Sequence, residues 1–165
     1  RFVESFQIAP QTLVPPILAS DLWVEDRHAI VDIGVQAFFH DDFLVSLHLL
    51  VPQIESAIRE VARSLGVSLQ KPNRYGGNDL RNINDLLVDE AVRDHLSDDL
   101  TFYLRAVLCD QRGWNIRNNL CHGIAKANEL DGTAARRVFL IVLLLSHLRL
   151  PTSGKIPEQG GGGGC

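Results

Sequence analysis

The longest regular pattern in the sequence runs from Asp41–Asp42 to Leu65 and is typical of an amphipathic helix. Apolar residues recur along it at steps of three and four, which places them on one helical face. They are Leu44, Leu47, Val51, Ile54, Ile58 and Val61. Asp41 or Asp42 is expected to cap the first turn, Pro52 to kink the middle, and Gly66 to supply the left-handed end. A helix this long needs other helices to cover its apolar face.

Shorter helical patterns lie on both sides of this segment. No stretch alternates apolar and polar residues as a half-buried strand does. The other ranges expected to be helical are 28–39, 83–89, 97–109, 115–129 and 133–150. Residues 66–79, with their Pro and Gly residues, are expected to form a loop, and 92–96 a turn. The sequence therefore predicts an all-α bundle of five or six helices.

Three sections of the chain differ in composition. Residues 1–27 carry Pro10, Pro15 and Pro16 and are expected to form an extended lead-in from a missing upstream region of the same chain. Residues 28–150 form the helical domain, and residues 151–165 are expected to be a flexible Gly-rich tail. Residues 138–145 are all apolar, so the last helix is expected to be central or shared with a second subunit.

Hydropathy, cysteine spacing and charge indicate where the protein is located and what it could bind. No apolar run is long enough for a membrane span, so no membrane partner is expected of this fragment. Cys109, Cys121 and Cys165 show no paired spacing, which predicts a reducing, cytoplasmic location without a disulfide framework. The net charge is −4, yet residues 101–150 hold 7 basic and 3 acidic side chains, so this half is locally basic. The basic half could pack beside an acidic layer or bind phosphate.

The chemically distinctive segment is Asn115–Ile124, within that basic half. Arg117 offers a planar guanidinium suited to phosphate, and His122 is of the residue type whose unperturbed pKa, about 6.5, suits proton transfer near neutrality. On an ideal helix these two are about 140° apart, whereas Asn118 and His122 are stacked four residues apart. Cleavage of RNA by its own 2′-hydroxyl needs a base and a cation, without a metal or other cofactor.

The spacing Arg117-Asn118-x-x-x-His122, preceded by Trp114-Asn115-Ile116 and followed by Gly123, resembles the signature of HEPN domains. With the segments 39–43 and 47–55, the similarity extends to the DUF4209 branch over about residues 30–148. The resemblance implies a metal-independent endoribonuclease that acts as a homodimer and leaves a 2′,3′-cyclic phosphate. It assigns phosphate binding to Arg117, proton transfer to His122 and polar support to Asn118.

Residues outside this motif have expected roles of their own. Asn115, Arg112 and Trp114 are expected to contact RNA, and His48 or Glu55 could lie behind Arg117 or His122. A metal site at His40, Asp41, Asp42, His48 and Glu55 is not expected, because His48 and Glu55 are two helical turns apart. Cys121 is expected to be a small buried hydrophobe, since adjacent helical residues point in different directions.

A structural interpretation stays open beside the catalytic one. Arg117 and Asn118 could cap the start of the helix, and His122 could be a core histidine. The domain would then be a non-catalytic module for dimerisation or for binding a nucleotide or partner.

Overall fold

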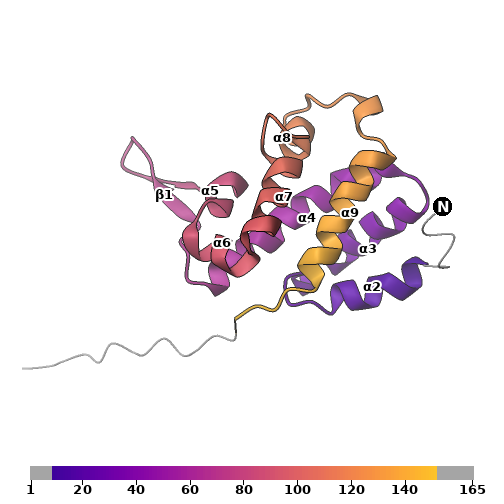
Figure 1. Ribbon diagram of the computed structural model, residues 1–165, viewed down its shortest axis with the longest axis horizontal. Coiled ribbons are helices and arrows are strands. Elements are labelled where there is room, and N and C mark those ends of the chain that lie inside the picture. The colour runs from indigo at the N-terminus through magenta and orange to yellow at the C-terminus, as the bar shows by residue number, and fades with distance from the viewer. Residues whose placement is uncertain (1–8, 152–165) are drawn as a thin grey trace, which may run out of the picture.

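Helix α4 (Phe43–Ser64) runs through the middle of the bundle (Figure 1). In this computed structural model, residues 9–151 are described. The Asp42 carboxylate caps α4 by accepting a hydrogen bond from the Val45 amide at 3.3 Å, and Gly66 follows with φ 73°. Both ends therefore lie where the capping pattern predicts them, and the helix continues through Pro52.

The all-α class is confirmed, with eight α-helices in residues 9–151 rather than five or six. Besides α4 they are α2 (Pro10–Leu18), α3 (His28–Phe39), α5 (Ile83–Leu87), α6 (Glu90–Leu96), α7 (Asp98–Leu108), α8 (Ile116–Cys121) and α9 (Gly132–Ser146). Two short 3₁₀ turns, Glu25–Arg27 and Ala127–Glu129, complete the helical part. Helices α2, α3 and α9 pack around one side of α4, while α5 to α8 gather toward its other side (Figure 1).

The core follows the apolar face of α4. Leu47, Leu50, Ile54 and Ile58 are almost completely buried, and α4 packs most extensively against α3 and α9. Contact with α3 is close at Gly34, where a Cβ atom would lie 2.7 Å from the Leu50 side chain. The main core therefore holds α4 in place. The side of α4 that faces away from this core can contact other parts of the chain.

The expectation of an extended lead-in over residues 1–27 is wrong for the part that the structure describes. Residues 10–18 form α2, with Pro10 in the first turn and Pro15 and Pro16 inside the helix. A proline costs a helix one backbone hydrogen bond, but tertiary packing overrides that cost here. Ile17, with the following residues Leu22 and Trp23, is buried against the bundle. This segment therefore belongs to the helical domain.

Several other predicted boundaries differ from the structure. The loop expected over 66–79 contains two antiparallel strands, β1 (Gln70–Pro72) and β2 (Asn78–Leu80). Both are three residues long and exposed on both faces, so they show no apolar alternation. The turn expected at 92–96 lies in α6, and the last helix ends at Ser146 rather than at residue 150.

Helix α9 is less deeply buried than its apolar sequence predicts. The Asp131 carboxylate caps it by accepting hydrogen bonds from the Thr133 and Ala134 amides at 2.8 and 2.9 Å. Five of the eight residues from 138 to 145 are buried, but Leu140 and Leu144 are exposed. Within residues 9–151, no helix is both long enough and apolar enough to cross a membrane. The Gly-rich tail from residue 152 lies outside the described residues.

Candidate functional site

Two backbone features of the connection from α7 to α8 position the motif segment, residues 115–124, against the bundle. One is at Gly113 and the other at Asn115. Gly113 lies so close to α7 that a Cβ atom there would be 2.1 Å from the Ala106 carbonyl oxygen. The next amide, of Trp114, donates to that same oxygen at 2.9 Å. Asn115 then takes the left-handed conformation, φ 50° and ψ 32°, which asparagine tolerates better than most residues. The chain turns here and enters α8.

A pocket of about 550 Å³ opens between α8 and the start of α5. Arg117, Asn118, His122 and Asn115 all line it, so the structure brings the predicted motif residues together. The remaining lining residues are Asn82, Ile83, Asn84, Cys109, Gln111, Asn119 and Ile124. We call this cavity the motif pocket. Its wall is rich in amide side chains, which can donate and accept hydrogen bonds.

Arg117 is held by Glu55 of α4. Its Nε and Nη2 atoms donate to the two carboxylate oxygens of Glu55 at 2.9 and 3.3 Å. The Glu55 carboxylate also accepts a hydrogen bond of 2.6 Å from Arg59, whose other end donates to the Arg81 carbonyl. These three side chains, which we call the Glu55 triad, are 15 to 20% exposed. Two guanidinium groups share one carboxylate, so the triad keeps one positive charge beside the motif pocket.

The environment of Arg117 keeps its guanidinium charged. Burial acts to lower the pKa of Arg117, but the hydrogen bonds and negative charge of Glu55 outweigh it and raise the pKa above its ordinary value. Its third nitrogen, Nη1, donates to Asn118 Oδ1 at 3.0 Å. Each nitrogen of the fork therefore has a partner, and the side chain is fixed in one orientation at the pocket wall.

A short chain of amide side chains continues from Arg117. Asn118 donates to Asn115 Oδ1 at 2.7 Å and to the Cys109 carbonyl at 3.3 Å. Asn115 in turn donates to Asn119 Oδ1 at 3.3 Å. Asn118 therefore links Arg117 to the turn that begins α8.

His122 lies where the sequence pattern did not place it. The helix expected to continue to residue 129 ends at Cys121, and His122 is the residue that follows its last turn. Gly123 has φ 66°, a left-handed conformation that ends the helix, and the Ile124 and Ala125 amides donate back to the Asn119 carbonyl. The His122 side chain is exposed and makes no hydrogen bond with any residue of the described part of the chain.

The other predicted residues separate into two groups. Glu55 contacts Arg117 directly, as described above. His48 does not: it is exposed, and its Nδ1 atom donates to the Leu44 carbonyl of its own helix at 2.7 Å. Arg112 is 89% exposed, pairs with Asp110 and does not line the motif pocket. Trp114 lies on a neighbouring pocket, where the Arg137 guanidinium lies 3.9 Å from its ring centroid.

The two described cysteines have different surroundings. Burial raises the pKa of the Cys109 thiol to about 11, and the nearby charge of Arg117 only partly opposes this. Cys121 is exposed, so the expectation that it is a buried hydrophobe is wrong. Cys121 is the last residue of α8.

Sequence reasoning missed four contributors to the site. Asn82, Asn84 and Gln111 line the motif pocket, and Arg59 completes the Glu55 triad. Asn82 carried a local signal, because an asparagine before an apolar residue often caps a helix, and it does cap α5. The other three carry no such signal, since their place depends on how distant helices pack.

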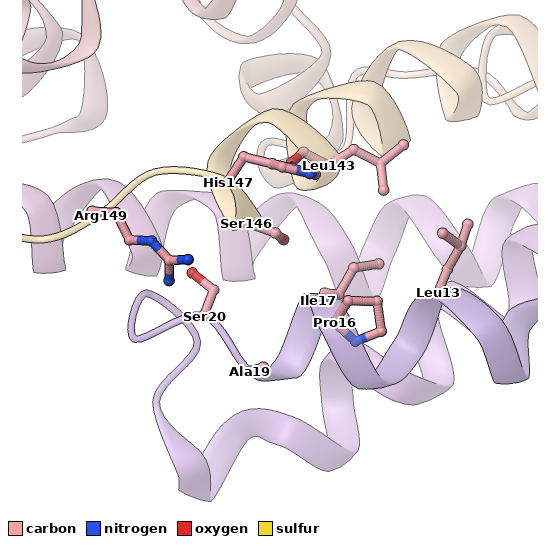
Figure 2. Close-up of a pocket in the computed structure, with 9 residues that line it drawn as sticks. All are labelled: Leu13, Pro16, Ile17, Ala19, Ser20, Leu143, Ser146, His147 and Arg149. Carbon is pink, nitrogen blue, oxygen red and sulfur yellow. The ribbon is translucent and has the colours of Figure 1, made fainter.

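A separate pocket of about 420 Å³ lies between α2 and the end of α9 (Figure 2). Its floor is apolar, with Leu13, Ile17 and Leu143, and Arg149 reaches toward Ser20 at its rim (Figure 2). The Ser146 hydroxyl is already engaged, since it accepts from Trp23 Nε1 and donates to the Val142 carbonyl. None of the residues predicted for function lines this pocket.

Comparisons with known proteins do not identify a relative of this chain. The chain matches no protein-family model, no curated protein and no solved structure. Among residues 9–151, no group of three His, Cys, Asp or Glu side chains is arranged to hold a metal ion.

Proposed function

We propose that this chain is a metal-independent endoribonuclease domain of the HEPN type. The observation that supports it is the shared pocket: Arg117, Asn118 and His122 line one cavity although His122 lies beyond the end of α8. Arg117 supplies a fixed charge, His122 supplies an exposed group able to take a proton, and amide side chains surround them. This combination suits a phosphodiester with a neighbouring hydroxyl.

In this proposal Arg117 stabilises the charge that builds on the phosphate oxygens. The Glu55 triad holds the guanidinium in place before the substrate arrives, which avoids the cost of ordering it during the reaction. The carboxylate is neutralised by Arg59 as well, so one positive charge of the triad is available to a phosphate. A phosphate oxygen exchanges for the Asn118 contact at Nη1 or for the longer Glu55 contact at Nη2.

His122 acts as the base. It takes the proton of the ribose 2′-hydroxyl, the 2′-oxygen bonds to phosphorus, and the bond from phosphorus to the 5′-oxygen breaks. The 5′-oxygen leaves on the opposite side and needs a proton of its own. A second His122, from a second copy of the chain, supplies it. The products are a 2′,3′-cyclic phosphate and a 5′-hydroxyl, and the working unit is a homodimer.

A specific observation favours a second candidate function. All three nitrogens of the Arg117 guanidinium donate to protein side chains, as in a purely structural arginine. In that case the domain is a non-catalytic module for dimerisation or for binding a nucleotide or partner. The two functions differ in whether Arg117 exchanges a protein contact for a phosphate.

The test is cleavage of single-stranded and structured RNA in EDTA by the purified protein. We expect Arg117→Ala and His122→Ala each to lower the rate by at least about 100-fold. Arg63→Ala and His40→Ala are matched controls, because both are exposed residues away from the motif pocket. Cleavage that persists in the two motif variants, or no cleavage by the parent protein, overturns the nuclease proposal.

Mixing the parent protein with the His122→Ala variant tests the dimer. The proposed reaction uses one His122 as the base and the second as the acid, so a mixed dimer with a single His122 is inactive. If the two subunits share a site, the activity of the mixture therefore falls below the share of parent chains. If each subunit works alone, the activity equals that share.

A further inference from the structure

Helix α8 separates the motif pocket from a second cavity of about 450 Å³, which we call the Trp114 pocket. The two cavities share one lining residue, Asn119. Trp114 and Asn115 are adjacent in sequence and line different cavities, so the turn before α8 supplies one residue to each. A polymeric ligand with one unit in the motif pocket therefore has a second cavity available for a neighbouring unit.

The Trp114 pocket combines an aromatic surface with a cation. Trp114 is 49% exposed, which is unusual for so large an apolar side chain, and Arg137 of α9 lies over its ring at 3.9 Å from the centroid. In residues 9–151 Arg137 makes no ion pair, although Glu129 and Asp131 line the same pocket. An exposed indole beside a guanidinium is a pairing with which proteins bind unpaired bases and their phosphates.

The rim of the pocket adds hydrogen-bond acceptors. Glu129 and Asp131 both line it. Asp131 uses Oδ1 to cap α9, and the hydrogen bonds from the Ala134 and Thr133 amides lower the pKa of this carboxyl. Glu129 uses Oε2 to accept from the Lys126 amide. The second oxygen of each carboxylate is left as an acceptor, which favours a ligand that carries N–H donors.

We propose that the Trp114 pocket binds an unpaired base of the RNA strand whose phosphodiester lies in the motif pocket. The base contacts the indole, its own phosphate lies at Arg137, and its amino group donates to Glu129 or Asp131. Guanine, adenine and cytosine carry such donors, whereas uracil offers carbonyl acceptors at the corresponding position. The pocket therefore prefers amino-bearing bases, guanine above all because it offers two neighbouring donors, N1–H and N2–H, to the free oxygens of Glu129 and Asp131. This inference rests on the proposed function for the choice of RNA as the ligand.

The two tryptophans of the chain make the proposal directly measurable. Trp23 is 4% exposed and its indole nitrogen donates to Ser146, whereas Trp114 lines the pocket. A base on Trp114 quenches that indole and leaves Trp23 unchanged. The experiment titrates GMP, AMP, CMP and UMP into the intact protein while its tryptophan fluorescence is recorded. Mononucleotides have no phosphodiester to cleave, so binding is measured apart from catalysis.

We expect saturable quenching by GMP, with UMP binding about tenfold more weakly. Arg137→Gln is expected to weaken GMP binding at least about fivefold while it keeps the Trp114 reporter. Trp114→Phe removes the signal, and Glu129→Gln reduces the preference for GMP over UMP. Arg63→Gln leaves GMP quenching unchanged, because that exposed arginine lines neither pocket.

Four results overturn the inference. They are the absence of saturable quenching by any nucleotide, equal affinity for all four, no effect of Arg137→Gln, and loss of quenching in Arg63→Gln. Quenching by a lysine-rich peptide but not by nucleotides also overturns it and identifies a protein partner instead. Failure of this subsite alone leaves RNA cleavage in EDTA intact, whereas failure of the proposed nuclease leaves GMP quenching without cleavage.

Discussion

Glu55 and Arg117 are 62 residues apart in the sequence, and their side chains meet through two hydrogen bonds of 2.9 and 3.3 Å. The contact joins the central helix α4 to the six-residue helix α8. It also determines which way the guanidinium of Arg117 points. The same ion pair therefore serves the stability of the bundle and the geometry of the motif pocket.

Substitution of Glu55 separates these two effects. Glu55→Gln leaves two largely buried arginines without a counter-charge, and we expect it to lower the free energy of unfolding by about 1–3 kcal/mol, between surface and buried pairs. The rate of RNA cleavage should fall by more than the loss of folded protein explains, because Arg117 loses its orientation. Urea denaturation and the EDTA cleavage assay measure the two quantities.

Glu60→Gln is the matched control for this experiment. It removes a carboxylate from the same helix, where Glu60 pairs with the exposed Arg63. We expect a change of at most about 1 kcal/mol and normal cleavage. An effect on stability and activity as small for Glu55→Gln as for the control would contradict the role given to the Glu55 triad.

The left-handed residue at the start of α8 can be tested by paired substitutions. Asn115→Ala puts alanine at φ 50° and removes two side-chain hydrogen bonds. Asn115→Gly removes the same bonds but accepts the backbone conformation. We expect the glycine variant to be more stable than the alanine variant by about 1 kcal/mol in thermal unfolding. The reverse order would show that the turn is not held in this conformation.

Gly113 is the point where the chain between α7 and α8 passes closest to α7. Gly113→Ala puts a methyl group against the Ala106 carbonyl oxygen, at 2.1 Å before any shift. Since backbone cannot move away as a flexible side chain can, we expect a loss of at least about 2 kcal/mol in chemical denaturation. Gly77→Ala is the control, because its nearest neighbour is the side chain of Asn73 at 3.3 Å and it should cost less than about 1 kcal/mol.

Cys109 and Cys121 are expected to be alkylated at different rates, and the difference should depend on pH. Iodoacetamide reacts with the thiolate, and at pH 8 a thiol with the raised pKa of Cys109, about 11, is ionised in about one molecule in a thousand. Peptide mapping after brief labelling should therefore find Cys121 modified well before Cys109. Labelling of Cys109 should rise steeply above pH 9, and Cys121→Ser should leave it unchanged. Early modification of Cys109 at pH 8 would contradict its burial.

The same thiol makes the folded state sensitive to alkaline pH. The folded pKa of Cys109, about 11, is above the reference value of 9.0, so the unfolded chain releases this proton first. The contribution to stability is fully present below about pH 9 and is lost as pH rises toward 11. Cys109→Ser should remove this part of the pH dependence, which denaturation midpoints at pH 8 and pH 10.5 would measure.

Local sequence rules predicted much of the fold because capping is a local event. Asp42 caps α4 as expected, and Asn82 and Ser97 cap α5 and α7 in the same way, by accepting hydrogen bonds from amides three residues later. The same rules failed for α2, where two prolines signal an extended chain but burial of Ile17 stabilises a helix. They also failed for the strands, whose pairing does not depend on an apolar face.

The site could be predicted only as far as its residues are neighbours in sequence. Arg117, Asn118 and His122 belong to one short motif, and they do line one pocket. Its support from Glu55 depends on packing between α4 and α8, so spacing could suggest the contact but not its geometry. The end of α8 at Cys121 was missed because the residues after it remain compatible with a helix, whereas tertiary packing and Gly123 end it.

Arg117 and His122 are attached to the protein in very different ways. Arg117 is fixed by side chains from α4 and α8, whereas the position of His122 is set by the backbone of a short turn. Insertions, deletions or grafted sequences between residues 122 and 126 can therefore move the histidine while the arginine stays where it is. The chain offers a natural starting point for engineering, in which the spacing between a fixed cation and a proton-transfer group is adjusted by loop design alone.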